Sequence, residues 1–212
     1  MDERVPADQT GWVDTRSELL LAAERLFALH GIDGVSLRQI AAAAGQRNVA
    51  AAHYHFGDKA KLIGAIFTSR LAHIDQRRAE LLDQARASRQ DEDLWSLCDV
   101  LARPFAEQAA RPGSHYARFV ARLYEHAGHT IEALPEYGLT GSAEEVVGLL
   151  GKLLAERLPG PVAQYRVELA GRLLITGTAD LEQHAERTGG LDEQRLLWLT
   201  DALAGLLTAP AR

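Results

Sequence analysis

This sequence of 212 residues has a single cysteine, Cys98, so the chain cannot form an internal disulfide bond. One cysteine is compatible with a reducing compartment. The sequence also lacks a run of about 18 apolar residues, the length that marks a membrane-spanning helix. Its first residues, MDERVPADQTGW, lack the apolar core of a signal peptide. These absences predict a soluble cytoplasmic protein that does not associate with membranes.

An excess of basic charge is also missing. The chain has 23 Lys and Arg residues against 29 Asp and Glu residues, and its formal net charge is −6. This balance argues against unspecific coating of nucleic acid or anionic membranes, because such binding depends on surplus positive charge. A local basic surface is still compatible with it. The hydrophobic content of 47% suffices for a sizeable core, in one large domain or two smaller ones.

Strand signals are nearly absent, and apolar residues recur at spacings of three and four almost throughout. This periodicity predicts an all-α protein. We expect a flexible arm over residues 1–13, followed by helices over 14–30, 37–44, 49–56, 59–88, 92–111, 114–127, 142–158, 161–187 and 191–208. Pro104 should kink the helix that contains it. The segment 128–141 should form a long loop.

The second of these helices has a strong start signal. Ser36 and Gln39 fit a capping box, in which the Ser36 hydroxyl accepts from the Gln39 amide and the Gln39 side chain reaches back. Asn48 and Asp58 can cap the third and fourth helices. Residues 36–56 therefore predict a helix-turn-helix, whose second helix enters the major groove of DNA.

On a helical wheel with about 100° per residue, the second helix of this unit has two sides. The apolar residues expected to face inward are Val49, Ala52 and Phe56. The opposite side holds small and polar residues, namely Ala50, Ala51, Tyr54 and His55. Small side chains would let the backbone approach base edges, and Tyr54 and His55 can donate to phosphates.

The charged residues of this region do not by themselves show whether it binds DNA. Residues 14–60 contain five cations and five anions, so a DNA-binding surface requires the cations to gather on one side. Arg38, Arg47 and Lys59 lie near helix starts, where this can happen. His53 fits a packed histidine as well as a phosphate contact. Joint metal binding by His53 and His55 is disfavoured, because they point about 200° apart. A helical hairpin without any ligand remains the alternative.

The run from Thr15 to Leu62 closely resembles the DNA-binding head of TetR-like transcriptional regulators. The motifs that carry the resemblance are AAERLFALHG, GVSLRQIAAAAG and HYHFGDK. The resemblance implies a three-helix head over 14–60, and a helical ligand-binding and dimerisation body over 61–212. It further implies a homodimer, more often a repressor than an activator, that binds a palindromic operator and is released by a small-molecule effector.

Site residues follow from the resemblance position by position. Those that match its DNA-contacting positions are Ser36, Arg38, Arg47, Asn48, Ala51, Ala52, His53, Tyr54, His55 and Lys59. Two departures stand out. The turn between Gly45 and Phe56 is one residue longer than in the commonest members, and His53 replaces a usual tyrosine.

In the body, the resemblance places the dimer interface on the helices at 161–187 and 191–208. The last helix carries seven leucines, more apolar surface than one internal face needs, which favours an interface over a fully buried helix. The effector pocket is expected among Trp95, Cys98, Phe105, Tyr116, Phe119, Tyr124 and His126, although aromatic residues at helical spacing also fill ordinary cores. The helix 59–88 should act as the lever between body and head.

Two other classes of protein are less consistent with the sequence. It has no GxSxG nucleophile elbow, phosphate-binding glycine loop or HExxH pair, so we expect neither an enzyme nor a cofactor or metal site. Cys98 lies among apolar residues and is expected to be a structural thiol. The remaining alternative is a helical protein-interaction scaffold without sequence-specific DNA binding, which would not need cations at the helix starts.

Overall fold

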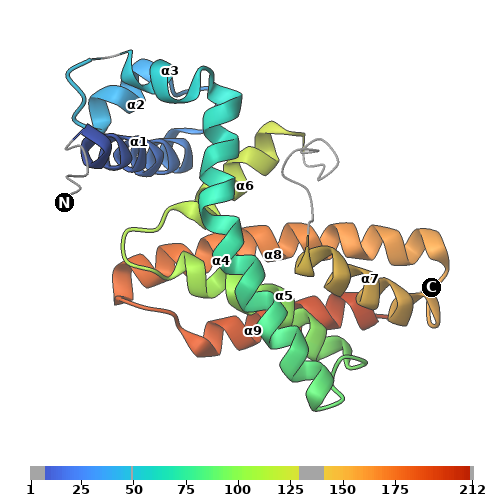
Figure 1. Cartoon of the computed structure of the whole chain (residues 1–212). Coiled ribbons are helices and arrows are strands. Elements are labelled where there is room, and N and C mark those ends of the chain that lie inside the picture. Colours follow the sequence, from blue (N-terminus) through green and yellow to red (C-terminus); the bar gives the residue numbers. More distant parts are fainter. Residues whose placement is uncertain (1–7, 49, 129–140, 211–212) are drawn as a thin grey trace, which may run out of the picture.

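The computed structural model describes residues 8–48, 50–128 and 141–210 (Figure 1). Within these residues it contains nine α-helices and no strand, which confirms the all-α class. The helices of the first part are α1 (Asp8–His30), α2 (Leu37–Ala43), α3 (Ala51–Phe56) and α4 (Lys59–Ala87). The others are α5 (Leu94–Ala109), α6 (Tyr116–His126), α7 (Ser142–Ala155), α8 (Gly160–Thr188) and α9 (Glu193–Thr208).

The main differences from the sequence-based expectations are at helix ends. Helix α1 begins at Asp8, so part of the expected arm is helical, and the expectation for residues 1–7 lies outside the described residues. Helix α3 begins at Ala51 rather than at residue 49, and its N-cap is Ala50 rather than the expected Asn48. Pro104 lies inside α5, as expected. Most of the loop expected over 128–141 also lies outside the described residues.

The start signals of α2 and α4 have the expected geometry. The Gln39 amide donates to the Ser36 hydroxyl at 3.3 Å, and the Ser36 amide donates to the Gln39 side chain at 2.8 Å, which confirms the capping box. Asp58 accepts from the Lys61 amide at 2.8 Å and so caps α4. This hydrogen bond lowers the pKa of the Asp58 carboxyl. Gly57 precedes it with φ of +80°, a conformation that favours glycine.

Helices α1, α2 and α3 form a head at one end of α4, and α5, α7, α8 and α9 gather around the other end (Figure 1). Two hydrophobic clusters fill these parts, but they do not divide at residue 60. The head cluster includes Phe27 of α1 and also Phe67, Phe105, Tyr116 and Phe119 from α4, α5 and α6. The body cluster is formed by residues from α4, α5, α7, α8 and α9. Helix α6 therefore packs with the head.

Two buried carboxylates hold the beginning of α6. Glu24 of α1 accepts from the His115 amide at 3.0 Å and from Arg70 Nε of α4 at 2.9 Å. Glu182 of α8 accepts from the Ala117 amide at 2.9 Å and from the Arg118 amide at 3.1 Å. Both carboxylates lie near the positive end of the α6 dipole. Through α6, the head is connected to α8 as well as to α4.

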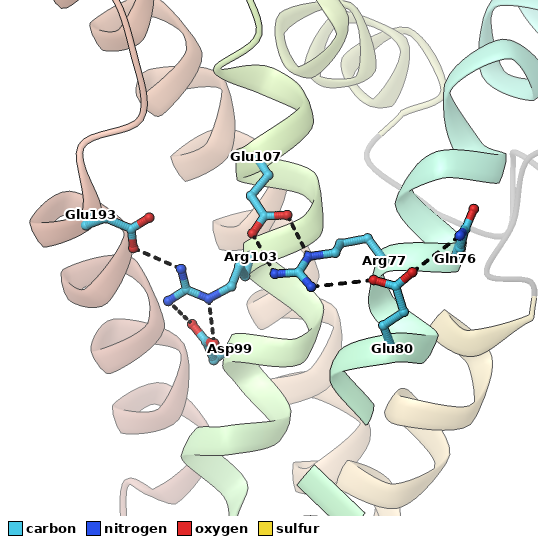
Figure 2. Close-up of polar contacts among 7 residues, drawn as sticks. All are labelled: Gln76, Arg77, Glu80, Asp99, Arg103, Glu107 and Glu193. Carbon is cyan, nitrogen blue, oxygen red and sulfur yellow. Dashed lines mark hydrogen bonds and ion pairs between the residues drawn. The ribbon is translucent and has the colours of Figure 1, made fainter. Parts of the chain in front are cut away.

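A second polar network connects α4, α5 and α9 (Figure 2). Arg77 of α4 donates from Nε and Nη2 to Glu107 of α5, at 3.0 and 3.2 Å. Arg103 of α5 donates to Asp99 at 2.9 Å and to Glu193 of α9 at 2.9 Å. The hydrogen bond to Glu107 raises the pKa of Arg77, and the hydrogen bonds to Asp99 raise the pKa of Arg103. The middle of α4 is thus tied to the body.

Candidate nucleic-acid interface

Helix α3 is anchored to the head through one apolar face. Ala52 is completely buried, and Phe56 and Ala51 are 6% and 9% exposed. The guanidinium of Arg16 lies over the Phe56 ring, 5.2 Å from its centroid. Phe56 and Ala52 therefore face inward, as the helical wheel predicts. Their packing fixes the orientation of the rest of α3.

The structure corrects the expected role of two alanines. The resemblance assigns Ala51 and Ala52 to DNA contact, but both belong to the core cluster of the head. Helix α3 has only six residues and packs against both α2 and α4. We conclude that Ala51 and Ala52 support the helix from inside.

The opposite side of α3 is open to solvent. Tyr54 is 69% exposed, and Ala50 and His53 are also exposed. His55 is half-buried, with its ring edge-on to Tyr54 at a centroid distance of 5.6 Å. Of the two interpretations of His53, the packed histidine is wrong. The three consecutive side chains His53, Tyr54 and His55 offer polar atoms at the surface end of α3.

Two arginines lie close to this face along the chain. Arg38 is in the first turn of α2 and Arg47 is in the turn before α3, and both are exposed. Within the part of the chain that the structure describes, neither has an acidic partner. Asn48 is also exposed, and its Oδ1 accepts from the Ala50 amide at 2.9 Å. This bond orders the entry to α3 and leaves the side-chain NH₂ group of Asn48 as a donor.

Ser36 and Lys59 already have partners within the head. The Ser36 hydroxyl is engaged in the capping box with Gln39. The half-buried Lys59 donates from Nζ to the Ile32 carbonyl at 2.9 Å. This bond ties the start of α4 to the segment after α1. An ammonium has three protons, so Lys59 keeps donors for a further acceptor.

The residues expected around an effector pocket separate in the structure. A cavity lies between α5, α7, α8 and α9, and Cys98 is the only one of the seven expected residues that lines it. Phe105, Tyr116 and Phe119 instead form an aromatic cluster, in which Tyr116 lies 5.9 Å from both Phe105 and Phe67. These rings fill the junction of head and body, as buried aromatic residues commonly do. Burial raises the pKa of the Tyr116 hydroxyl.

The other three expected pocket residues make polar contacts elsewhere. Trp95 Nε1 donates to Asp201 of α9 at 2.7 Å. The Tyr124 hydroxyl accepts from Arg172 Nε of α8 at 2.9 Å. His126 Nδ1 lies 3.0 Å from Asp33, just beyond α1. These contacts join helices, and sequence periodicity carries no signal for any of them.

The expected interface helices keep some apolar surface. Four leucines of α9 are buried inside the body, namely Leu196, Leu199, Leu203 and Leu207. Trp198 of α9 remains 58% exposed and Tyr165 of α8 remains 60% exposed. Most of the leucine surplus therefore serves the body core. The exposed aromatic rings are the clearest unpartnered apolar groups on α8 and α9.

The described residues contain neither a metal-binding cluster nor a membrane-spanning helix. No group of three or more His, Cys, Asp or Glu side chains there is arranged to hold a metal ion. Among the described helices, none combines the length and the apolar character needed to cross a membrane.

Part of this chain is similar in sequence to known proteins. Residues 19–66 match the model of the family described as "Bacterial regulatory proteins, tetR family". The HTH-type transcriptional repressor AcnR of Corynebacterium efficiens is 35% identical over 90 residues, which are 42% of this chain and 47% of the relative. The match thus spans about half the length of that relative. A TetR-family transcriptional regulator from Pectobacterium atrosepticum is similar at 22% identity, with a TM-score of 0.44, over 98% of this chain and 100% of that chain.

The short helix α2, the glycine-containing turn and the exposed face of α3 define a helix-turn-helix protein. The matched segment includes most of this unit and the start of α4. The resemblance to TetR-like regulators that the motifs carry is therefore confirmed for residues 19–66.

Proposed function

We propose that this protein is a ligand-responsive transcriptional repressor that acts in the cytoplasm as a homodimer on a palindromic operator. The observation that carries the proposal is the exposed face formed by α3, the first turn of α2 and the turn before α3. Within the described residues, Arg38 and Arg47 lack acidic partners there, and Tyr54 stands out from α3. The name of the relative from Corynebacterium efficiens, a transcriptional repressor, supports the sign of regulation.

The proposed contacts divide into positioning and sequence recognition. The groups at the edges of the unit bind phosphates, namely Ser36, Arg38, His53, Tyr54, His55 and Lys59. Arg47 and Asn48 precede α3 and reach base edges in the major groove. Ala51 and Ala52 are no longer part of this set, because the core encloses them.

The homodimer is proposed to form through α8 and α9. Their exposed rings, Tyr165 and Trp198, would be covered in such an interface, where aromatic residues are enriched. A dimer is needed because two heads must meet successive major grooves about 34 Å apart. An effector would act by favouring a dimer whose heads have a different spacing.

The test of this function begins with in vitro selection of bound DNA, followed by titration of the selected duplex against salt. We expect a palindromic site and a steep loss of affinity as salt rises. Replacing Arg47 by Ala should remove about 1–3 kcal/mol of discrimination at one base position. The Lys59→Ala variant should weaken all sequences alike and lower the salt slope by about 1.

Arg157→Ala is the matched control, because Arg157 is an exposed arginine outside the head. It should leave the selected site and the affinity unchanged. If no duplex is enriched, or if Arg47→Ala and Arg157→Ala behave alike, the proposal fails. Binding of protein partners without DNA selection would then favour the helical scaffold.

A further inference from the structure

The turn between α2 and α3 begins with backbone hydrogen bonds that end α2. Gly45 has φ of +69°, and its amide donates to the Ala42 carbonyl at 3.1 Å. The Gln46 amide donates to the Ala41 carbonyl at 3.0 Å. Together these bonds form a Schellman motif. They join the turn to α2 alone, so another contact must fix the turn against the rest of the head.

The side chain of Gln46 makes that contact with α1. Its Nε2 donates to Glu18 Oε2 at 2.9 Å and to the Ala44 carbonyl at 3.3 Å. A side-chain amide has two protons, so both donors of Gln46 are already used inside the head. Glu18 lies 28 positions earlier in the sequence, in the exposed part of α1. The pair therefore holds the turn against a helix that is distant along the chain.

Helix α1 also contacts the other end of α3. The Arg16 guanidinium lies over the ring of Phe56, which is the last residue of α3. Arg16 and Glu18 are two residues apart, and their contacts lie on either side of the proposed base contacts Arg47 and Asn48 in the chain. The first described turns of α1 thus support the DNA-reading unit both before and after these two residues.

The charge of Glu18 is not neutralised by its partner. Gln46 is neutral, and within the described part of the chain no Lys, Arg or His forms an ion pair with Glu18. A carboxylate beside a surface that binds phosphates repels DNA of any sequence. The same residue therefore orders the turn and opposes binding that does not depend on sequence.

We propose that Glu18 is a specificity-determining residue that acts through Gln46. It holds the turn in the position from which Arg47 and Asn48 reach base edges, and its charge lowers the affinity for unselected DNA. Glu18 is a positioning residue in this scheme, whereas Arg47 and Asn48 make the contacts. The inference rests on the proposed function, because it concerns the arrangement of the DNA-reading surface.

The experiment compares Glu18→Ala with Glu18→Gln. Glu18→Ala removes the charge and the acceptor, whereas Glu18→Gln removes the charge and keeps an oxygen that can accept from Gln46. The affinity for the selected duplex divided by that for an unselected duplex should fall about three- to tenfold in Glu18→Ala, the effect of one hydrogen bond. This ratio should be preserved in Glu18→Gln. Both variants should bind unselected DNA about two- to fivefold more tightly at low salt.

Two further variants separate position from charge. Gln46→Ala removes the hydrogen bond but no charge, so it should lower the affinity ratio as Glu18→Ala does without tightening the binding of unselected DNA. Adding Gln46→Ala to Glu18→Ala should lower the ratio no further, because both variants remove the same contact. Glu156→Ala is the matched control, since Glu156 is an exposed glutamate at the end of α7, and it should change neither quantity.

Hydrogen exchange measures the order of the turn without DNA. The Ala50 amide donates to Asn48 at 2.9 Å, and the Gln46 amide belongs to the motif that ends α2. Exchange of these two amides should be about threefold faster or more in Glu18→Ala and unchanged in Glu18→Gln. The Gln90 amide is the internal reference, because it has the equivalent position at the end of α4.

Three results would overturn the proposal. Glu18→Ala could keep the affinity ratio of the unmodified protein, Glu18→Gln could lower the ratio as much as Glu18→Ala, or the ratio could fall in Glu18→Ala without faster exchange in the turn. The last two results would mean that charge acts without the hydrogen bond. Failure to select any DNA would refute the proposed function, and the exchange rates would then still decide whether Glu18 positions the turn.

Discussion

The head and the body of this chain use their small side chains in opposite ways. In the head, Ala51 and Ala52 close the core under α3, and the polar side chains of the same helix face solvent. In the body, Ala170 borders an apolar pocket between four helices that is partly open to solvent. Small side chains therefore complete a core in one region and leave room beside it in the other, according to the residues that they face.

The two regions also meet in a way that the sequence did not indicate. The expected lever was the helix over 59–88 alone, which corresponds to α4. In the structure, α1 packs more extensively against α6 than against α4. The head therefore has two attachments to the body. Substitutions in each region can test how far head and body are separate, beginning with the largest expected effect.

Replacing Phe119 by Ala should have the largest effect on stability. Phe119 is completely buried on α6, with its ring 6.0 Å from Phe27 of α1 and 5.6 Å from Phe67 of α4. The cavity left behind should lower the free energy of unfolding by about 3–5 kcal/mol. Urea unfolding measures this, and Leu21→Ala on the exposed side of α1 should change it by less than about 0.5 kcal/mol. Equal effects of both variants would mean that α6 does not support the head.

A Glu182→Gln substitution tests the attachment of α6 to α8. Glu182 is 1% exposed and accepts from two α6 amides and from Arg118 Nε at 2.9 Å. Removing its charge should cost about 3 kcal/mol, because Arg118 loses its buried partner and keeps only the exposed Glu186. Glu186 also pairs with Arg118 but is largely exposed, so Glu186→Gln should cost less than about 1 kcal/mol. Chemical denaturation of both variants gives the comparison, and a smaller loss for Glu182→Gln would contradict it.

The Ser36→Ala variant concerns the head alone. It removes the capping box at the start of α2 and should cost about 1 kcal/mol. Ser17→Ala in the exposed interior of α1 is the matched control, and it should be neutral or slightly stabilising because alanine is the better helix former. Thermal unfolding of the two variants measures the difference. Equal stability of the two variants would mean that the capping box does not stabilise the head.

The smallest expected effect is on a reaction rate, the alkylation of Cys98 in the body. Burial raises the pKa of the Cys98 thiol to about 12. At pH 8, about four units below this pKa, about one thiol in 10⁴ is present as the thiolate. Alkylation by iodoacetamide should therefore be very slow in the folded protein and fast in urea. The pKa of this thiol is near 9 in the unfolded chain and about 12 in the folded protein. Its contribution to the stability of the folded state is therefore fully present below pH 9 and is lost as the pH rises towards 12. Rapid labelling of the folded protein at pH 8 would show that the cavity region opens freely.

Much of the fold could be predicted from the sequence, although less of the site could. The helix order, the capping box at Ser36 and the Asp58 cap were expected, because each depends on residues within four positions of one another. The TetR-type head followed from its motifs. The burial of Ala51 was missed, because a wheel treats α3 as a long helix with one inward side. Among the expected pocket residues only Cys98 lines the pocket of the body, since aromatic spacing does not distinguish a core from a cavity.

The sequence by itself determined where helices start and stop, which faces are apolar and which motifs mark the head. Local hydrogen bonds and periodicity are sufficient for these features. Only the tertiary structure decided that Glu24 and Glu182 hold α6 from two sides, that aromatic rings fill the junction, and that four helices leave a cavity beside Cys98. Helical periodicity specifies that a face is buried, whereas the partner of that face depends on segments that lie far away along the chain.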